Sequence, residues 1–467
     1  MFKFGTDGYR AIIGSGFDFK TVGELTKALC SYLKTTKDKP YIIIGYDTRF
    51  LSDKFAAFSA DVALEEGLKV ELTQNFVPTP MLSYAVVNQE ADSGIVITAS
   101  HNPYYYNGFK IKNAQGGSAS PAQINALKPF LKDNVEIPKH NFHSKPKCDL
   151  IDPSIAYFKH IETIIDKGKF AKTQYKVVVD PMYGSGQGYF KQILDKYNLQ
   201  TIEIHNEINL AFGGLQPEPI SENLKPLREA VLNNGADIGL ALDGDADRSG
   251  IFDEQGNFIN SHQIFALLLY HLVENKKLKG LVVKTFSTTS LIDSMAEHYG
   301  LKVKQTPVGF KHISDYMLKE NVLIGGEESG GIGLKGHIPE RDGILIGLMM
   351  LELMAETGKK LSDLIAYLYS RFGNFSYNRI DKIIQPEVRQ SLYKNLQNTD
   401  ISQLVNKSVK NTMNEDGCKF EFSDRSWLMF RLSGTESVVR IYAEAHSKDE
   451  VKKLLEQGNN LVASLTR

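Results

Sequence analysis

The sequence predicts an α/β protein in which three consecutive α/β domains, with mixed and largely parallel sheets, are followed by a smaller C-terminal α+β domain. Three observations support this fold class. Short apolar runs rich in β-branched residues alternate with helix-like segments, which is the pattern of βαβ units. This alternation restarts twice along the 467 residues. After about residue 370 the pattern changes to strands typical of an antiparallel sheet, followed by a closing helix.

The first domain is predicted over residues 1–147. Its strands are expected at apolar runs that end in a glycine or a polar loop, such as YIIIG and GIVIT. Strands are expected at residues 41–45, 68–72 and 94–98, and a helix at residues 55–66. A stretch with prolines and lysines, residues 138–147, is interpreted as the linker that ends this domain.

The second and third domains are predicted over residues 148–255 and 256–370, and the fourth over residues 371–467. Runs such as KVVVD and IGLAL are typical of strands buried on both faces. The strands expected in these domains lie at residues 176–180, 238–242, 281–284, 302–306, 322–324, 426–431 and 438–445. The helices expected between and after them lie at residues 263–274, 289–299 and 448–466.

Composition and charge argue against several classes of protein. Hydrophobic residues form 42% and charged residues 23% of the chain, the balance of a globular protein. The 54 basic and 55 acidic residues give a net charge of −1, so we expect no general attraction to nucleic acid or to an anionic membrane. The cysteines at positions 30, 148 and 418 are widely separated and lack CxxC spacing, which argues against a disulfide framework and a zinc site.

The apolar segments are also too short for a membrane protein. The most apolar candidate, residues 343–354, is interrupted by Glu352 and falls short of the roughly 18 residues that a membrane span needs. The start of the chain, MFKFGTDGYRA, lacks the apolar segment of a secretory signal. We therefore expect a cytoplasmic protein without a membrane partner.

An acidic loop follows one of the predicted strands. In open α/β sheets, ligands bind beyond the carboxyl ends of the strands. The run at residues 238–242 leads into Asp243, Asp245 and Asp247, with Gly244 after the first. Three carboxylates at alternate positions can direct oxygens at one cation, and oxygen ligands suit Mg²⁺ or Mn²⁺. An EF-hand is disfavoured because a strand leads into the loop and no ligand-spaced glutamate closes it. An acidic surface turn is the alternative.

A serine follows another predicted strand. The run at residues 94–98 leads into Ser100 within the sequence ASHNP, and the segment NGFK follows. A serine is a poor nucleophile unless a base, a metal or a charged field activates it. His101 is adjacent, but neighbours in a loop need not face one another, and no GxSxG elbow surrounds Ser100. Considered alone, Ser100 is interpreted more readily as a turn residue than as a catalytic one.

Taken together, the motifs resemble those of the α-D-phosphohexomutase family. The principal motifs are TASHNP with NGFK at residues 98–110, DGDADR at residues 243–248, GEESGG at residues 326–331 and RLSGTES at residues 431–437. Two further motifs agree, FGTDGYR at residues 4–10 and GYDTR at residues 45–49. They occur in the family's order and span almost the whole chain. The resemblance implies four domains around a central cleft, each contributing one loop.

The resemblance also implies roles for individual residues. Ser100 would be the phosphoserine, and Asp243, Asp245 and Asp247 would hold Mg²⁺ together with an oxygen of that phosphate. The basic residues that would line the reacting end are Arg10, Lys110 and Arg248. The residues that would contact sugar hydroxyls are Glu327 and Ser329. The residues that would bind the phosphate that is not transferred are Arg431, Ser433, Gly434, Thr435 and Arg440.

The implied activity is that of a phosphoglucomutase, which interconverts glucose 1-phosphate and glucose 6-phosphate. Phosphorylated Ser100 would donate its phosphoryl group to the sugar monophosphate, and the resulting sugar 1,6-bisphosphate would reorient and return the other phosphate. Such transfer needs neutralised charge and in-line placement, which Mg²⁺ and basic residues supply. The expected partner is a hexose phosphate, and the family resemblance permits a monomer or a homodimer.

The chain departs from the family pattern at Gly331, where one large branch has a histidine. A base role for that histidine has no counterpart here. His337, in the segment GHIPERDG, is one substitute, and this arrangement resembles the phosphoglucomutase-like branch. Lys110 is the other candidate acid or base, provided that nearby positive charge lowers its pKa toward neutrality.

Several alternatives stay open. The same chemistry on another sugar would make the protein a phosphomannomutase, a dual-specificity phosphomannomutase/phosphoglucomutase or a phosphoglucosamine mutase. The sequence Glu327-Glu328-Ser329 favours glucose over the amino sugar. A non-catalytic phosphosugar-binding protein would be expected to lack the serine, a metal ligand or the basic residues. A phosphatase with an aspartate nucleophile would leave the motifs around Ser100 and Arg431 without a role.

Overall fold

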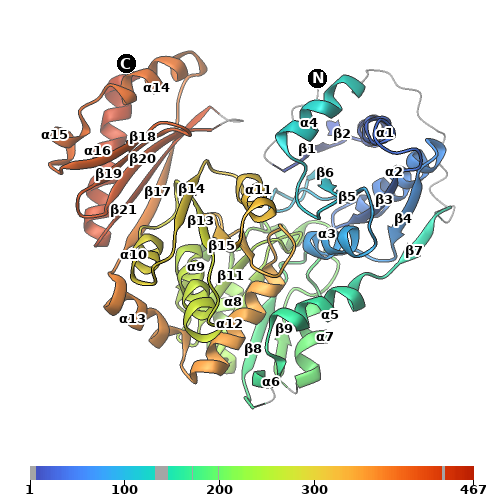
Figure 1. Ribbon diagram of the computed structural model, residues 1–467, viewed down its shortest axis with the longest axis horizontal. Helices are drawn as coiled ribbons and strands as arrows, with labels where there is room; N and C mark the ends of the chain where they lie inside the picture. The colour runs from blue at the N-terminus through green and yellow to red at the C-terminus, as the bar shows by residue number, and fades with distance from the viewer. Residues whose placement is uncertain (1–6, 132–145, 171, 198, 434–436, 467) are drawn as a thin grey trace.

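A computed structural model describes residues 7–131, 146–170, 172–197, 199–433 and 437–466. Within these residues the strands form four sheets, with helices packed against them (Figure 1). Figure 1 shows the first sheet and the last at opposite ends of the molecule, with the other two between them. Three mixed sheets precede an antiparallel one, which confirms the predicted fold class. The motif residues 4–6 and the predicted linker as far as residue 145 lie outside the described residues.

The first sheet has the strand order β2-β1-β6-β5-β3-β4-β7. Strands β3, β4, β5 and β7 run parallel, whereas β6 is antiparallel to both β5 and β1. The strands are β1 (Tyr9–Ile13), β2 (Gly16–Phe17), β3 (Tyr41–Tyr46), β4 (Lys69–Thr73), β5 (Ser93–Ile97), β6 (Tyr106–Asn113) and β7 (Asp149–Ile151). The helices are α1 (Phe19–Lys34), α2 (Ser52–Glu65), α3 (Thr79–Asn88) and α4 (Pro121–Leu127). Strand β7 joins this sheet although it follows the boundary expected at residue 147.

The second sheet has the order β12-β11-β10-β8-β9, and its strands β8, β9 and β10 are parallel. Strand β10 is fully buried and antiparallel to β11, so the short connection between them is the acidic loop. The strands are β8 (Lys176–Asp180), β9 (Gln200–Glu203), β10 (Ile238–Leu242), β11 (Ser249–Asp253) and β12 (Phe258–Ile259). The helices are α5 (Ser154–Ile164), α6 (Lys167–Phe170), α7 (Tyr189–Leu194) and α8 (Lys225–Asn234).

The third sheet has the order β14-β13-β15-β16, with β16 antiparallel to β15. Helix α9 continues into one turn of π-helix at His271–Asn275. The strands are β13 (Leu281–Thr285), β14 (Val303–Thr306), β15 (Val322–Gly326) and β16 (Ile332–Leu334). The helices are α9 (Ser261–Tyr270), α10 (Leu291–His298), α11 (Phe310–Lys319), α12 (Gly343–Thr357) and α13 (Leu361–Phe372).

The fourth sheet is antiparallel, with the order β17-β21-β20-β19-β18. Helix α16 packs on it, chiefly against β17 and β21 (Figure 1). The strands are β17 (Ser376–Ile383), β18 (Val409–Met413), β19 (Cys418–Phe422), β20 (Trp427–Leu432) and β21 (Val438–Ala445). The helices are α14 (Arg389–Gln397), α15 (Ile401–Val405) and α16 (Lys448–Leu465). This is the predicted α+β domain.

Helix α12 lies at the centre of the largest apolar core, which joins residues of the first three sheets. It is apolar on all sides and buried from Gly343 to Met354, as expected for a helix surrounded by protein. Asp342 caps its N-terminus by accepting from the backbone of Leu345. Its one buried charge, Glu352, accepts from His271 at 3.0 Å and Lys276 at 2.6 Å. No helix in the described part of the chain is both long and apolar enough to cross a membrane.

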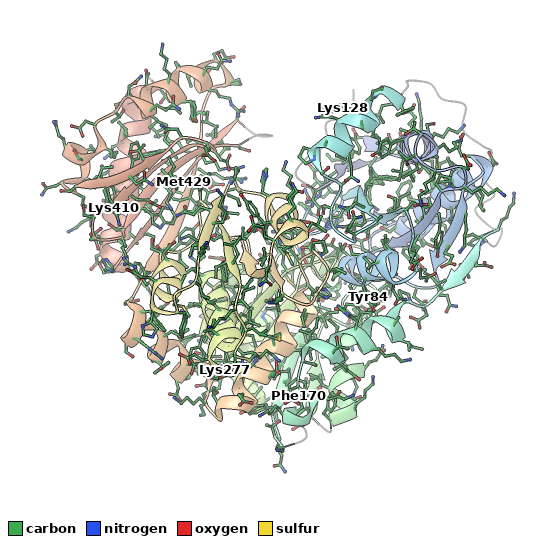
Figure 2. The ribbon with its side chains drawn as sticks, in the orientation of Figure 1. Tyr84, Lys128, Phe170, Lys277, Lys410 and Met429 are labelled. Atoms are coloured by element: carbon green, nitrogen blue, oxygen red, sulfur yellow. The ribbon has the colours of Figure 1, made fainter. Side chains whose placement is uncertain are left out.

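The third and fourth domains meet through an aromatic cluster. Phe286, Trp427, Met429 and Tyr442 form it, and Figure 2 shows Met429 where the C-terminal sheet approaches the neighbouring domain. Trp427 is fully buried, and its indole donates to Glu444 at 2.9 Å. Because it is the only tryptophan in the chain, its fluorescence reports on this junction.

Candidate active site

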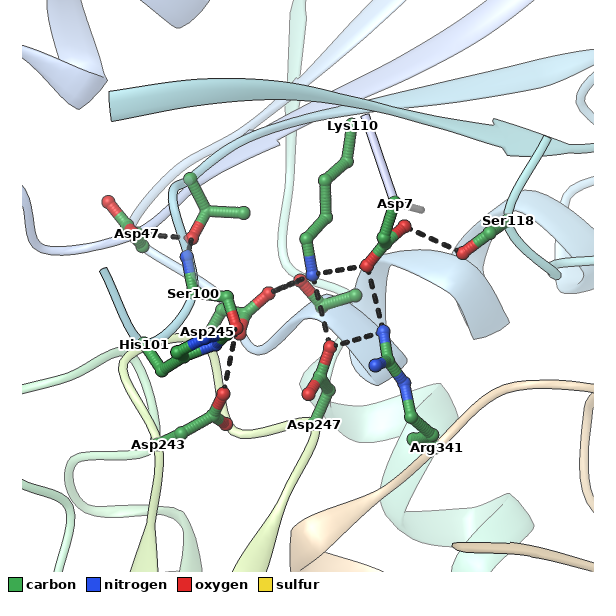
Figure 3. A network of polar contacts seen from close by, with 12 residues as sticks. Asp7, Asp47, Ser100, His101, Lys110, Ser118, Asp243, Asp245, Asp247 and Arg341 are labelled. Atoms are coloured by element: carbon green, nitrogen blue, oxygen red, sulfur yellow. Dashed lines mark hydrogen bonds and ion pairs between the residues drawn. The ribbon is translucent and has the colours of Figure 1, made fainter. Parts of the chain in front are cut away.

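The serine loop (residues 98–105, after β5) and the aspartate loop (residues 243–248, after β10) meet directly (Figure 3). The hydroxyl of Ser100 donates to a carboxylate oxygen of Asp243 at 2.9 Å, and both side chains are buried. Helix α3 also contacts the aspartate loop, because the hydroxyl of Thr79 donates to Asp245 at 2.5 Å. Two domains therefore contribute the serine and the carboxylate to one buried point.

Ser100 has a left-handed backbone conformation, with φ of 52°, which is uncommon for a residue with a side chain. Arg49 stabilises it. Its buried guanidinium donates to the carbonyls of Ser100 at 2.6 Å and Asn102 at 2.7 Å, and also to those of Pro103 and Tyr106. Such a strained residue persists only where its surroundings determine its conformation, and the planar fork of an arginine is suited to that task.

The three aspartates form a compact acidic cluster. Carboxylate oxygens of Asp243, Asp245 and Asp247 lie within 4.8 Å of one another, and all three side chains are buried. Burial, together with the charges of Asp247 and Asp245, raises the pKa of Asp243 well above its ordinary value. One oxygen of Asp245 and one of Asp247 accept no hydrogen bond from the described residues. Buried carboxylate oxygens without donors are the arrangement that a hard cation satisfies.

Lys110 lies on β6 and points its ammonium group into the same cluster (Figure 3). Its nitrogen is 2.6 Å from Asp245, 3.0 Å from Asp247 and 2.8 Å from Asp7. Burial alone would lower the pKa of Lys110, but these carboxylates raise it above its ordinary value. The condition for an acid or base role, a pKa lowered by nearby positive charge, is therefore not met. The acidic neighbours Asp7, Asp245 and Asp247 are distant from Lys110 in the sequence and meet it only in the fold.

Asp7 and Arg341 are two members of the cluster to which the sequence analysis assigned no role. The guanidinium of Arg341 is 2.8 Å from Asp7 and 2.7 Å from Asp247. Burial would lower the pKa of Arg341, but Asp247 and Asp7 hold it well above its ordinary value. Asp7 belongs to the motif FGTDGYR and Arg341 to the segment GHIPERDG. The sequence contains both segments but gives no sign that these two side chains meet in the fold.

The predicted basic residues Arg10 and Arg248 flank this cluster. Arg10 on β1 donates to the side chain of Asn102 in the serine loop at 2.8 Å. The backbone of Arg248 donates to Asp243 at 3.0 Å, and its side chain lies 3.7 Å from Asp247. Both guanidinium groups act electrostatically on His101, and its pKa is lowered well below the ordinary value by burial and by these charges. The surroundings of Ser100 thus combine buried acids with several cations.

The predicted sugar-contacting loop follows β15 and contains Glu327 and Ser329. Burial raises the pKa of Glu327, and the backbone amide of Gly309 donates to it. A Cβ atom at Gly331 would lie 2.4 Å from the Arg341 side chain and 3.1 Å from a carboxylate oxygen of Glu327. The glycine therefore leaves space that Arg341 occupies. A histidine at this position would collide with Arg341 as it is placed here.

The predicted phosphate-binding residues lie where β20 leads into β21. Arg431 and Arg440 are cross-strand partners, and the backbone of Ser433 donates to Val438 at 2.9 Å. The Nε atom of Arg431 donates to Asp416 at 2.9 Å, and that of Arg440 is 3.5 Å from Asp381. The structure thus brings both arginines and Ser433 to one end of the hairpin. Gly434 and Thr435 lie outside the described residues.

His337 lies in a different buried cluster. Its ring nitrogens are 2.9 Å from His160 on α5 and 3.0 Å from Asp342, the residue that caps α12. Asp342 also accepts from Tyr157 at 2.7 Å. Among the described residues the polar contacts of His337 are therefore with these groups and not with Ser100. The geometry favours a structural role over the acid or base role considered from the sequence.

Comparisons with known proteins identify the family of each of the four domains. Residues 1–137, 155–256 and 260–372 match the phosphoglucomutase/phosphomannomutase alpha/beta/alpha domains I, II and III, and residues 388–460 match the C-terminal domain of that family. A phosphoglucomutase/phosphomannomutase from Thermococcus kodakarensis is 32% identical over 462 residues, covering 98% of each chain. A phosphoglucosamine mutase from Caldicellulosiruptor bescii is 30% identical, covering 99% of this chain and 98% of the relative.

Solved structures give the same result. The crystal structure of a putative phosphomannomutase from Thermus thermophilus has a TM-score of 0.86 and 34% identity, covering 99% of each chain. A phosphoglucomutase from Paramecium, in an open form, shares the fold with a TM-score of 0.86 at 21% identity, covering 99% of this chain and 95% of that one. With matches along its length, the chain belongs to the phosphoglucomutase/phosphomannomutase family of phosphohexomutases, which are isomerase-class enzymes.

Proposed function

We propose that this phosphohexomutase interconverts glucose 1-phosphate and glucose 6-phosphate, with Ser100 as the residue that carries the phosphoryl group. The observation that supports this most directly is the 2.9 Å contact between the Ser100 hydroxyl and Asp243 at the edge of the acidic cluster. A turn serine has no need of a buried carboxylate cluster, whereas a serine that carries a phosphate needs a cation beside it.

The acidic cluster fits Mg²⁺. Asp243, Asp245 and Asp247 supply oxygen ligands, and two of their oxygens lack donors among the described residues. When bound, Mg²⁺ would neutralise charge on the transferring phosphoryl group. Lys110 now contacts Asp245 and Asp247 and satisfies part of their charge.

The cations around Ser100 have a clear task in phosphoryl transfer. Lys110, Arg248 and Arg10 would stabilise the equatorial oxygens of the phosphoryl group as it passes between oxygens. The bond from phosphorus to the serine oxygen breaks as a bond to the sugar hydroxyl oxygen forms. The sugar hydroxyl loses a proton in this step and the Ser100 oxygen gains one, so there is no net uptake or release of protons. In the structure the resulting Ser100 hydroxyl donates a hydrogen bond to Asp243. The carboxylates of Asp245 and Asp247, 2.6 and 3.0 Å from the Lys110 nitrogen, favour its charged form.

The remaining loops would bind the rest of the substrate. Glu327 and Ser329 are suited to sugar hydroxyls, and Arg431, Ser433 and Arg440 to the phosphate that is not transferred. One such site for the second phosphate lets the bisphosphate rebind in the reverse orientation without a second set of residues. A hexose 1,6-bisphosphate would accordingly serve as the intermediate and as the activator of unphosphorylated enzyme.

The sugar is the finer part of this proposal. The loop sequence Glu327-Glu328-Ser329 favours glucose, whereas the relatives include a phosphoglucomutase/phosphomannomutase and phosphoglucosamine mutases. The test is turnover of purified enzyme on glucose 1-phosphate, mannose 1-phosphate and glucosamine 1-phosphate, each with and without Mg²⁺. We expect the highest kcat/KM on glucose 1-phosphate and loss of turnover when the metal is chelated. A higher value on mannose or glucosamine phosphate would overturn the glucose assignment alone.

The same panel run on Ser100→Ala tests the chemistry. We expect turnover at background and, by intact-mass analysis after incubation with glucose 1,6-bisphosphate, no phosphorylated population. Ser120→Ala is the matched control, because its hydroxyl caps α4 away from the acidic cluster. Full turnover by Ser100→Ala would reject the phosphoserine, and absence of phosphorylation in the unaltered chain would favour a binding protein.

A further inference from the structure

Asp416 occupies a tight turn between β18 and β19 that is held against the neighbouring strand. The next residue, Gly417, has φ of 110°, and a Cβ atom there would lie 2.3 Å from the carbonyl of Phe430 on β20. Only glycine fits this close approach. The turn is held on its other side by Tyr393, whose hydroxyl donates to the carbonyl of Asn414 at 2.6 Å. The position of Asp416 relative to β20 is therefore well determined.

One oxygen of Asp416 accepts two hydrogen bonds from different domains. The Nε–H of Arg431, at the end of β20, donates to it at 2.9 Å, and the backbone N–H of Val308 donates at 2.8 Å. Val308 lies in the third domain, between β14 and α11. The side chains of Asp416 and Arg431 are 22% and 15% exposed, so water competes weakly for this charge-assisted contact. Burial would lower the pKa of Arg431, but Asp416 raises it above its ordinary value.

The same short loop also touches the sugar-contacting residues. Gly309 follows Val308, and its backbone amide donates to Glu327. Two consecutive amides therefore connect Glu327 on one side with Asp416 and Arg431 on the other. A shift of this loop would move the carboxylate at one end and the guanidinium at the other together.

The contact also fixes how Arg431 is presented. A guanidinium carries five N–H donors, and Asp416 engages the one at Nε. A hydrogen bond at this atom sets the plane and the rotation of the group and uses neither terminal nitrogen. Without it, the long side chain would sample several rotamers, and ordering such a side chain on binding would weaken substrate affinity.

We propose that Asp416 is a positioning residue for substrate binding, which orients Arg431 toward the non-transferred phosphate and couples it to the sugar-contacting loop through Val308. It touches neither the substrate nor the reacting phosphoryl group. The inference rests on the proposed role of Arg431 as a phosphate ligand.

The test is steady-state kinetics of Asp416→Ala and Asp416→Asn with glucose 1-phosphate. Loss of a charge-assisted contact predicts that Asp416→Ala raises KM by about ten- to a hundredfold. We expect kcat to change less than KM, because the reacting end is untouched. Asp416→Asn keeps an acceptor oxygen and should restore part of the affinity. Glu415→Ala, one residue earlier in the same turn, is the matched control and should behave as the unaltered enzyme.

Arg431→Ala and the double variant separate the two proposals. If Arg431→Ala raises KM and the double variant is no worse, Asp416 acts through Arg431, as proposed. If Arg431→Ala raises KM while both Asp416 variants leave it unchanged, the positioning role is wrong and the phosphate role stands. An unchanged KM in Arg431→Ala would instead overturn the phosphate role. If Asp416→Ala does not fold, Asp416→Asn carries the same comparison.

Discussion

Some single residues in this protein determine the position or the backbone conformation of a neighbouring residue. Gly331 leaves the space in which Arg341 reaches Asp7 and Asp247, and any larger residue there would displace it. Arg49 holds Ser100 in a conformation that the serine would rarely adopt by itself. Neither Gly331 nor Arg49 has a direct role in the proposed chemistry. Each restricts the conformations that a neighbouring residue can adopt, which is how active sites are pre-organised.

His262 makes stability depend on pH at the junction of the last two domains. It is buried against Tyr377 with ring centres 4.4 Å apart, and burial and the charge of Lys284 lower its pKa to about 3. An unfolded chain protonates this histidine near pH 6.5, so below that pH only the unfolded state gains the proton. Stability should therefore fall as the pH decreases, by about 2 kcal/mol between about pH 7 and pH 5 for this group.

The measurement is urea unfolding followed by Trp427 fluorescence, for the unaltered chain and for His262→Phe. The phenylalanine keeps a ring against Tyr377 and cannot take up a proton. We expect the stability of the unaltered chain to fall more steeply toward pH 5 than that of the variant. Equal slopes would show that another group governs the acid sensitivity of this junction.

At the scale of elements, the site is made by loops whose backbones touch. A Cβ atom at Gly244 would lie 2.4 Å from the carbonyl of Ser100, and one at Gly184, after β8, would lie 2.7 Å from the carbonyl of Gly244. Three strand-to-loop connections from two sheets thus pack backbone against backbone. The polar residues follow the strands as expected for α/β sheets, but the distance between the loops depends on these glycines.

Gly244→Ala should separate the aspartate loop from the serine loop. The added methyl group would force a backbone shift, and a displacement near 1 Å at a reacting group can lower kcat about a hundredfold. The measurement is kcat together with thermal unfolding. Gly235→Ala is the control, because its φ of 57° is strained for alanine while nothing lies within 4 Å of the added atom. That change should lower stability and leave kcat unchanged, and full activity in Gly244→Ala would contradict the close-packing argument.

At the scale of the whole molecule, buried polar pairs fasten one domain to the next. Lys112 on β6 lies 2.6 Å from Glu340, which belongs to the third domain, and neither side chain is exposed. Thr48 donates to the carbonyl of Tyr183 at 2.7 Å and so connects the first domain with the second. In the buried Lys112–Glu340 ion pair, desolvation offsets much of the attraction between the charges.

Removing one partner of the Lys112–Glu340 pair should therefore lower the free energy of unfolding more than replacing both partners does. Lys112→Met removes the nearer of the two cations beside the buried Glu340 and leaves Arg341 at 3.4 Å, so it is expected to destabilise the protein by at most about 3–5 kcal/mol. In the double variant Lys112→Met/Glu340→Gln the buried carboxylate charge that lost Lys112 is also removed, and part of the stability should return. Scanning calorimetry of both variants measures the difference. A double variant as unstable as Lys112→Met would show that packing, and not charge, holds this junction.

Much of the fold could be predicted because buried strands have a local signature. The strands at residues 176–180, 238–242 and 438–445 have the expected bounds, since each is a run of residues that favour extended structure. Strand β6 was not predicted, because it buries Asn107, Lys110 and Lys112, residues that periodicity assigns to a loop. Lys110 and Lys112 are paired with carboxylates of other domains, and Asn107 donates to Ser52 within the first domain.

The sequence by itself determined which side chains follow each strand, and so it placed Ser100 and the three aspartates at candidate loop positions. Only the tertiary structure decided what surrounds them. It brought Asp7 and Arg341 to the cluster from segments more than 300 residues apart, and it raised the pKa of Lys110. The physical reason is that electrostatic interactions depend on distance in space. The sequence gives only the order of residues along the chain.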